Sequence, residues 1–155
     1  IRPSWVFGPE DVALNRFLGM SRFLPFVPLI GNASKQRLQP VFVDDVARAV
    51  AESLEKPAAE NRVFEIGGPE ILTMREIVKT ALEAAGRKRL LLASPKLLMK
   101  LAASIVQFAP GRPLTPDAVD FITMDALADP SEIEAALGIR MTPLREALAT
   151  YLTTA

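Results

Sequence analysis

The sequence predicts an α/β fold in which a few short strands alternate with helices and a helix-rich segment follows. Short apolar runs end at glycine or proline turns, as strands do, at residues 1–7 and 63–66. Each run is followed by a capping residue and by apolar positions at helical spacing. With 155 residues, half of them hydrophobic, the chain is long enough to bury a core of its own.

The composition excludes several functional classes. The chain contains no Cys and no His, so it has no disulfide, thiol nucleophile or imidazole base, and we expect no metal site. The net charge is zero and the only tight basic cluster is Arg87-Lys88-Arg89, so we expect no nucleic-acid binding. No secretory segment begins the chain and no apolar run reaches the roughly 18 residues of a membrane span, so we expect a cytoplasmic location.

The first elements follow from local signals. Residues 1–7 resemble the end of a strand that runs into a loop, because Pro3 has no N–H to donate to a central sheet. A segment that starts in this way predicts that a further part of the domain lies upstream. After the Gly8-Pro9 turn, the sequence predicts a helix over residues 11–22, and then a loop broken by Pro25 and Pro28.

The segment after a polar connector predicts a strand at residues 41–43 and a helix capped by Asp44 or Asp45. Two adjacent carboxylates could also act as a catalytic pair, since neighbouring carboxylates can push each other's pKa values apart, but anionic side chains at a helix start favour the capping role. The apolar positions on one face of this helix are Val46, Val50 and Leu54.

A third unit is strand, turn and helix. The predicted strand at residues 63–66 stops at Gly67-Gly68-Pro69, and Thr73 with Glu76 forms a capping box. Gly86 is a typical C-terminal stop, and residues 90–93 predict one more strand.

The remainder predicts helices, because a capping side chain followed by Pro recurs four times. These starts are Ser94-Pro95, Thr115-Pro116, Asp129-Pro130 and Thr142-Pro143. The apolar segment at residues 95–110 could lie on a membrane with Lys96 and Lys100 reaching outward, or be buried between domains, and its length favours burial.

Three phrases in order carry a resemblance: "RPSWVFGP", "QPVFVDDVARAV" and "VFEIGGPEILTMREI". They resemble the C-terminal half of extended short-chain dehydrogenase/reductase proteins of the NAD-dependent epimerase/dehydratase type, in particular the branch of the accessory complex I subunit. The resemblance implies the C-terminal part of a Rossmann-like doubly wound fold. Residues 1–93 would be its last strands and helices with the substrate loop, and residues 94–155 an α-helical, substrate-side subdomain.

The resemblance implies that the intact protein binds NAD or NADP through an upstream half. This chain has neither the family's glycine-rich phosphate loop nor its Tyr-x-x-x-Lys pair, so we expect no tight cofactor binding and no catalytic residue here. The loop expected beside the nicotinamide consists of Pro3, Ser4, Trp5 and Val6. The substrate entrance would be shaped by Phe7, Gly8 and Pro9, although packing for stability explains both sets equally well.

The resemblance also bears on the substrate. Trp5 stands where sugar-nucleotide epimerases typically have an Asn, and Leu38 stands where they have the Arg that holds the diphosphate. Arg37 is adjacent, but a shift of one residue in an extended segment turns a side chain to the opposite face. We therefore expect an apolar ligand such as a quinone, isoprenoid or acyl chain. The substrate-side residues added here are Phe17, Arg37 and Gln39.

The predicted function is the substrate side of an NAD(P)-dependent epimerase, dehydratase or reductase-like protein, or of a protein that supports complex I assembly or stability. The alternative is a non-enzymatic module that binds a lipid, quinone or partner helix. A third hypothesis is a helix-rich interaction domain with an accidental resemblance. The expected partners are the missing half or a second copy of the chain, a small apolar substrate, and complex I or the inner membrane surface.

Overall fold

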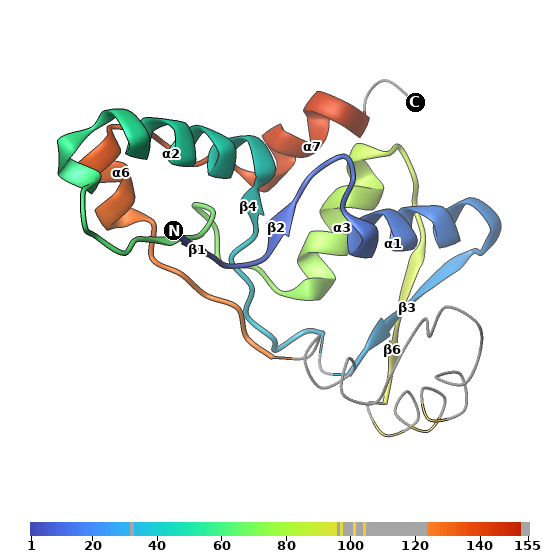
Figure 1. Cartoon of the computed structure of the whole chain (residues 1–155). Coiled ribbons are helices and arrows are strands. Elements are labelled where there is room, and N and C mark those ends of the chain that lie inside the picture. The colour runs from blue at the N-terminus through green and yellow to red at the C-terminus, as the bar shows by residue number, and fades with distance from the viewer. Residues whose placement is uncertain (32, 96, 98–100, 102–103, 105–123, 153–155) are drawn as a thin grey trace.

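The computed structural model describes residues 1–155 except 32, 96, 98–100, 102–103, 105–123 and 153–155. It confirms the predicted α/β fold (Figure 1). The apolar segment predicted at residues 95–110 and the start at Thr115-Pro116 fall largely outside the described residues. Across the described ranges, none of the helices has the length and apolar character that a membrane crossing requires.

The described strands are short and form parallel pairs, and helices make the crossover connections that parallel strands need. The pairs are β1 (Arg2–Pro3) with β5 (Glu65–Ile66), β2 (Val6–Phe7) with β4 (Val41–Phe42), and β3 (Phe26–Ile30) with β6 (Leu90–Ser94).

The single strand predicted at residues 1–7 is split into β1 and β2. Within β1, the N–H of Arg2 donates to Phe64 O (2.8 Å) and the N–H of Ser4 donates to Ile66 O (3.0 Å), so Pro3 is not required to donate. Trp5 O then accepts from Val41 N (2.9 Å) on the other neighbour. The N-terminal segment therefore changes its pairing partner from β5 to β4 between Ser4 and Trp5.

The loop predicted around Pro25 and Pro28 is wrong, because this segment forms β3. The bonds at its two ends run from Leu90 N to Pro25 O (3.2 Å) and from Gly31 N to Ser94 O (2.9 Å). Backbone groups alternate in direction along a strand, so the nitrogen of Pro28 points away from β6. A proline at that position costs the pair no hydrogen bond.

The helices are mostly where the sequence places them. They are α1 (Val12–Phe23), α2 (Val43–Glu55), α3 (Met74–Ala84), α6 (Ser131–Leu137) and α7 (Leu144–Leu152), with a short 3₁₀ turn at Pro57–Ala59. The predicted helix over residues 11–22 is confirmed, with Asp11 accepting from Ala13 N and Leu14 N at 3.0 Å. Gly86 follows α3 at a φ of 68°, a backbone angle that favours glycine.

The start of α2 corrects the predicted cap. Phe42 is the N-cap residue, it provides no capping side chain, and Asp44 and Asp45 lie in the first turn. The buried side of α2 carries Asp45 and Ala49. The predicted apolar face is largely exposed, since Val50 is 45% and Leu54 84% accessible.

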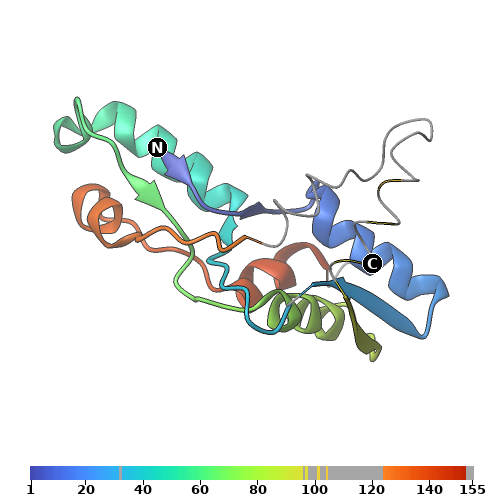
Figure 2. The same cartoon turned by 90° about the horizontal axis from the view of Figure 1, so that it is seen from below.

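Two apolar clusters form the core. One lies between α1, α3, α7 and the β3–β6 pair, and its members include Phe7, Leu29, Ile77 and Leu148. The second joins β4 and β5 to α2 and α6, and its members include Phe64, Ile66, Ile133 and Leu137. The last two helices therefore pack in different places, α6 beside α2 and α7 beside α3 (Figures 1 and 2). The domain division at residue 93 stays a prediction.

The first prediction concerns the capping box, which the structure confirms. Thr73 Oγ1 accepts from Glu76 N (3.2 Å), and Glu76 Oε2 accepts from Thr73 N (2.7 Å), which lowers the pKa of Glu76. Thr73→Ala removes the cap, so we expect the free energy of unfolding to fall by about 1 kcal/mol in a urea titration. Thr80→Ala, in the same helix but away from its start, is the control. An equal loss in both variants would contradict the capping role.

Candidate functional site

The carboxyl ends of β1 and β5 lie side by side, and Gln39 joins them. Its side-chain amide donates to Gly68 O (2.8 Å) and accepts from Ala128 N (3.2 Å), while its backbone carbonyl accepts from Ser4 Oγ. Gln39 is only 7% exposed. We name this arrangement the Gln39 junction, made of Ser4, Gln39, Gly67, Gly68 and Ala128. In open α/β sheets, ligands bind outside the carboxyl ends of the strands, which makes the junction the candidate site.

The two glycines allow this close approach. A Cβ on Gly67 would stand 2.3 Å from Ala128 O, and a Cβ on Gly68 would stand 1.9 Å from Pro40 O. Both distances are far below van der Waals contact, so no larger residue fits without movement of the backbone. The predicted turn at Gly67-Gly68 therefore serves packing as well as ending the strand.

Two adjoining cavities lie along β5 beside the junction. One, of about 350 Å³, is lined by Arg2, Val63, Glu65, Asp129 and Glu132. The other, of about 290 Å³, is lined by Gln39, Glu65, Ile71, Leu127, Ala128 and Asp129. The walls carry Glu65, Asp129 and Glu132 against a single Arg, although Glu132 is ion-paired with Arg62. A hydrogen bond from Ser131 N (2.9 Å) lowers the pKa of Asp129, which keeps it anionic. An acidic wall of this kind disfavours a polyanionic ligand.

Of the four residues predicted beside a cofactor, two lie at the junction and two pack against the core. Pro3 and Ser4 end β1 at the junction. Trp5 packs against the first apolar cluster, and Val6 packs against the second. Their assignment to a nicotinamide stays a prediction.

The residues predicted at a substrate entrance are more dispersed. Phe7 is 1% exposed and its ring lies 5.7 Å from that of Phe42. A Cβ on Gly8 would stand 2.6 Å from Val43 Cγ1, so this turn touches the start of α2. Pro9 is exposed and its carbonyl accepts from Asn15 Nδ2 (2.7 Å), while Phe17 packs against the first cluster. Their part in substrate binding stays a prediction.

Arg37 and Gln39 face different surroundings. The Arg37 side chain is 62% exposed and pairs with Asp125 (3.4 Å), whereas Gln39 is buried in the junction. Between them, Leu38 is 3% exposed and exchanges two 2.8 Å backbone hydrogen bonds with Leu72. Neighbouring residues on this segment therefore point to opposite sides, as the extended backbone predicts.

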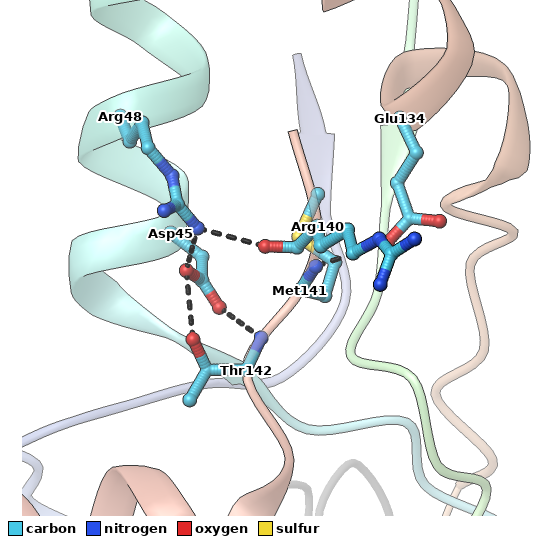
Figure 3. A network of polar contacts seen from close by, with 6 residues as sticks. All are labelled: Asp45, Arg48, Glu134, Arg140, Met141 and Thr142. Carbon is cyan, nitrogen blue, oxygen red and sulfur yellow. Dashed lines mark hydrogen bonds and ion pairs between the residues drawn. The ribbon is translucent and has the colours of Figure 1, made fainter. Parts of the chain in front are cut away.

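Sequence reasoning missed the main role of Asp45. It is 2% exposed and accepts from Thr142 N (2.6 Å) and Thr142 Oγ1 (3.0 Å), and from Arg48 Nη2 (2.5 Å). Arg48 also donates to Arg140 O (2.7 Å), and Glu134 accepts from Met141 N (3.0 Å) nearby (Figure 3). Asp45 thus fastens α2 to the segment that starts α7. The only sequence signal for this contact was Thr142, which was predicted as a capping residue before Pro143.

The titratable groups set limits on chemistry here. Burial, with a further contribution from Asp11, raises the pKa of Tyr151 to about 12, so its hydroxyl stays protonated at neutral pH. Among the described residues, Asp and Glu do not gather into a group that could hold a metal ion. Asp45 already has its hydrogen-bond donors within the fold, which suits a structural role.

Comparison with known proteins gives consistent results. No family model matches the sequence. The chain is 32% identical over 146 residues to NADH dehydrogenase [ubiquinone] 1 alpha subcomplex subunit 9, mitochondrial, of Rattus norvegicus, which covers 93% of this chain and 38% of that protein. It is 26% identical over 152 residues to the same subunit of Dictyostelium discoideum, covering 96% and 42%. The chain therefore spans less than half the length of these curated relatives.

Solved structures share the fold. UDP-N-acetylglucosamine 4-epimerase from Bacillus cereus matches with a TM-score of 0.69 and 18% identity, over 99% of this chain and 44% of the epimerase. The human epimerase family protein SDR39U1, solved with NADPH, matches with a TM-score of 0.68 and 23% identity, over 99% and 48%. The resemblance to part of an epimerase-type short-chain dehydrogenase/reductase, on the branch of the complex I subunit, is thus confirmed.

The second prediction tests the Asp45 network. Asp45→Asn removes the charge paired with Arg48 and sets an amide nitrogen or a weaker acceptor against Thr142. We expect the free energy of unfolding to fall by about 2 kcal/mol in a urea titration. Asp44→Asn, one residue earlier and exposed, is the matched control and is expected to change stability by less than about 0.5 kcal/mol. Similar losses in the two variants would show that the Asp45 contacts contribute little.

The third prediction tests the close approach at the junction. Gly68→Ala sets a methyl group against Pro40 O, and we expect it to lower the free energy of unfolding by about 2 kcal/mol or more. Gly19→Ala is the control, because nothing lies within 4 Å of its Cβ position in the middle of α1. That change is expected to stabilise the helix by about 0.5–1 kcal/mol. A Gly68→Ala variant as stable as the wild type would refute the packing described here.

Proposed function

We propose that this chain is the substrate-side part of a complex I-type short-chain-dehydrogenase-like subunit, whose role is to support assembly or stability of the respiratory complex. The observation that carries the proposal is the similarity to subunit 9 of the rat enzyme over 93% of the chain. The fold shared with an epimerase agrees with this proposal. So does the Gln39 junction, whose side-chain amide is already bonded within the fold.

The site supports a structural role over sugar-nucleotide turnover. Leu38 is buried and bonded through its backbone to Leu72, and Trp5 packs against the core, so neither position presents a polar group to a diphosphate or sugar. The cavities beside Gln39 carry carboxylates that would repel a diphosphate. A small apolar molecule remains the class of substrate that we propose, should the intact protein turn one over.

We further propose that the intact protein binds NAD or NADP, with Pro3, Ser4, Trp5 and Val6 forming one side of the cofactor site. Support comes from the solved neighbours, of which a Bacillus cereus UDP-glucuronic acid 4-epimerase holds NAD and the human protein holds NADPH.

The exposed strip on α2, formed by Val50 and Leu54, is the surface that we assign to the rest of the intact protein or to self-association. A position at the periphery of the inner membrane follows from the role in complex I.

The fourth prediction tests this function. Membranes of the source cell are separated by native electrophoresis and probed with an antibody to this chain. We expect the intact protein to migrate with NADH dehydrogenase activity, and we expect deletion of its gene to lower the amount of assembled complex. A protein found only at low mass, with an unchanged amount of complex after deletion, would overturn the assembly role. Titration of the purified intact protein with NADPH, followed by fluorescence, tests the cofactor separately.

A further inference from the structure

An exposed apolar surface lies where α1 ends and the β3–β6 pair begins. Phe23, the last residue of α1, is 88% exposed, and Leu90, the first residue of β6, is 62% exposed. Leu24, Phe26 and Leu92 are also exposed. We name these five residues the apolar tip, and they come from the end of α1, the turn into β3, and the first half of β6 (Figure 1).

The tip is held in place by the fold. Phe26 and Leu90 are register partners in the parallel pair, and Leu90 N donates to Pro25 O. The side chains of Val27 and Leu91 face the core, so Phe26, Leu90 and Leu92 occupy the opposite face of the same two strands. The β3–β6 pair is therefore apolar on both faces, and only one face is covered by the core of this chain. An exposed apolar face of this kind often marks an interaction surface.

The two chain segments that carry the tip contain basic residues and no acidic ones. Residues 16–31 and 84–95, which form the tip and its surroundings, contain no Asp or Glu in a chain whose net charge is zero. They contain Arg16, Arg22, Arg87, Lys88 and Arg89. Within the described part of the chain, no salt bridge to a carboxylate involves Arg22, Arg87, Lys88 or Arg89.

The guanidinium groups of this cluster are oriented by the end of α1. Arg87 Nη1 donates to Leu18 O (2.7 Å) and Ser21 Oγ (2.9 Å), and Arg89 Nε donates to Ser21 O (2.8 Å). Arg22 and Arg87 also line a cavity of about 290 Å³ whose apolar wall includes Leu18. The charges of Arg87 and Arg89 are therefore fixed at the end of α1, next to Phe23.

The exposed strip on α2 has the opposite electrostatic character. Val50 and Leu54 lie on a helix that also carries Asp44, Glu52 and Glu55. Helix α2 lies at the other end of the molecule from the tip in both views (Figures 1 and 2). The chain thus offers two exposed apolar surfaces, of which only one is surrounded by basic residues.

We propose that the apolar tip docks onto a bilayer that contains anionic phospholipid. Phe23 and Leu90 enter the boundary between headgroups and acyl chains, while the exposed Arg22 and Lys88 contact the lipid phosphates. Arg87 and Arg89, held at the end of α1, add positive charge nearby. An apolar face bordered by basic side chains is the pattern by which proteins bind membrane surfaces without crossing them. The proposal deepens the peripheral location given above, but it requires neither a bound cofactor nor complex I.

The fifth prediction is tested by flotation of the intact protein with two kinds of vesicle, pure phosphatidylcholine and phosphatidylcholine with about 30% phosphatidylglycerol. We expect binding to the anionic vesicles at low salt, and weaker binding to the neutral vesicles and at high salt. Phe23→Ser is expected to lower the partition coefficient by about tenfold or more, because this variant has no aromatic ring to insert into the bilayer. Lys88→Gln, in an exposed residue, should lower it only on anionic vesicles.

Leu54→Ser is the matched control, since it removes an equally exposed apolar side chain from α2 and is expected to bind vesicles like the wild type. Circular dichroism of each variant verifies the fold. Lack of vesicle binding by the folded wild type would overturn the proposal, as would equal losses for Phe23→Ser and Leu54→Ser. A positive result stands even if the protein does not migrate with complex I, so failure of the proposed function and failure of this inference can be distinguished.

Discussion

The arrangement of this chain depends on the close contact of three backbone segments at the Gln39 junction. With Gly67 against Ala128 O and Gly68 against Pro40 O, the segments lie closer than any side chain would permit. Gln39 then satisfies an acceptor on one segment and a donor on another from a position that water scarcely reaches. The two glycines permit this contact, and the Gln39 amide stabilises it because it pairs polar groups that are buried there. The strand ends, and the cavities along β5, take their positions from it.

A second polar contact relates the C-terminal helices to this frame. Asp45 on α2 accepts two hydrogen bonds from Thr142, a separation of 97 residues along the chain. Glu70, which follows β5, accepts from Leu144 N (2.9 Å) at the start of α7. Both carboxylates therefore occupy the N-terminal end of α7, where unpaired N–H groups and the helix dipole favour negative charge. The cap that the sequence predicted at Asp44 or Asp45 is not formed, and Asp45 instead binds the segment that precedes α7.

Features determined by near neighbours could be predicted from the sequence. The Thr73–Glu76 box depends on residues three positions apart and is present as expected. The helix predicted over residues 11–22 is also present, and its first turn is capped by Asp11. The strand through Pro28 could not be predicted, because a proline is tolerated there only if its nitrogen points away from the neighbouring strand β6. The sequence does not show which side β6 occupies. The same holds for Gln39, since its amide binds Gly68 and Ala128, which are distant in sequence and carry no side-chain signal.

The distribution of charge adds an argument about orientation. The cavities along β5 are lined by Glu65, Asp129 and Glu132, whereas the tip is surrounded by Arg87, Lys88 and Arg89. An anionic bilayer attracts the second surface and repels the first, within a Debye length of about 8–10 Å. Because α6 lies at the other end of the molecule from the turn between α1 and β3 (Figures 1 and 2), docking at the tip would hold Glu132 of α6 away from the lipid. A neutral chain can therefore be oriented at a membrane, since orientation depends on where the charges lie and not on their sum.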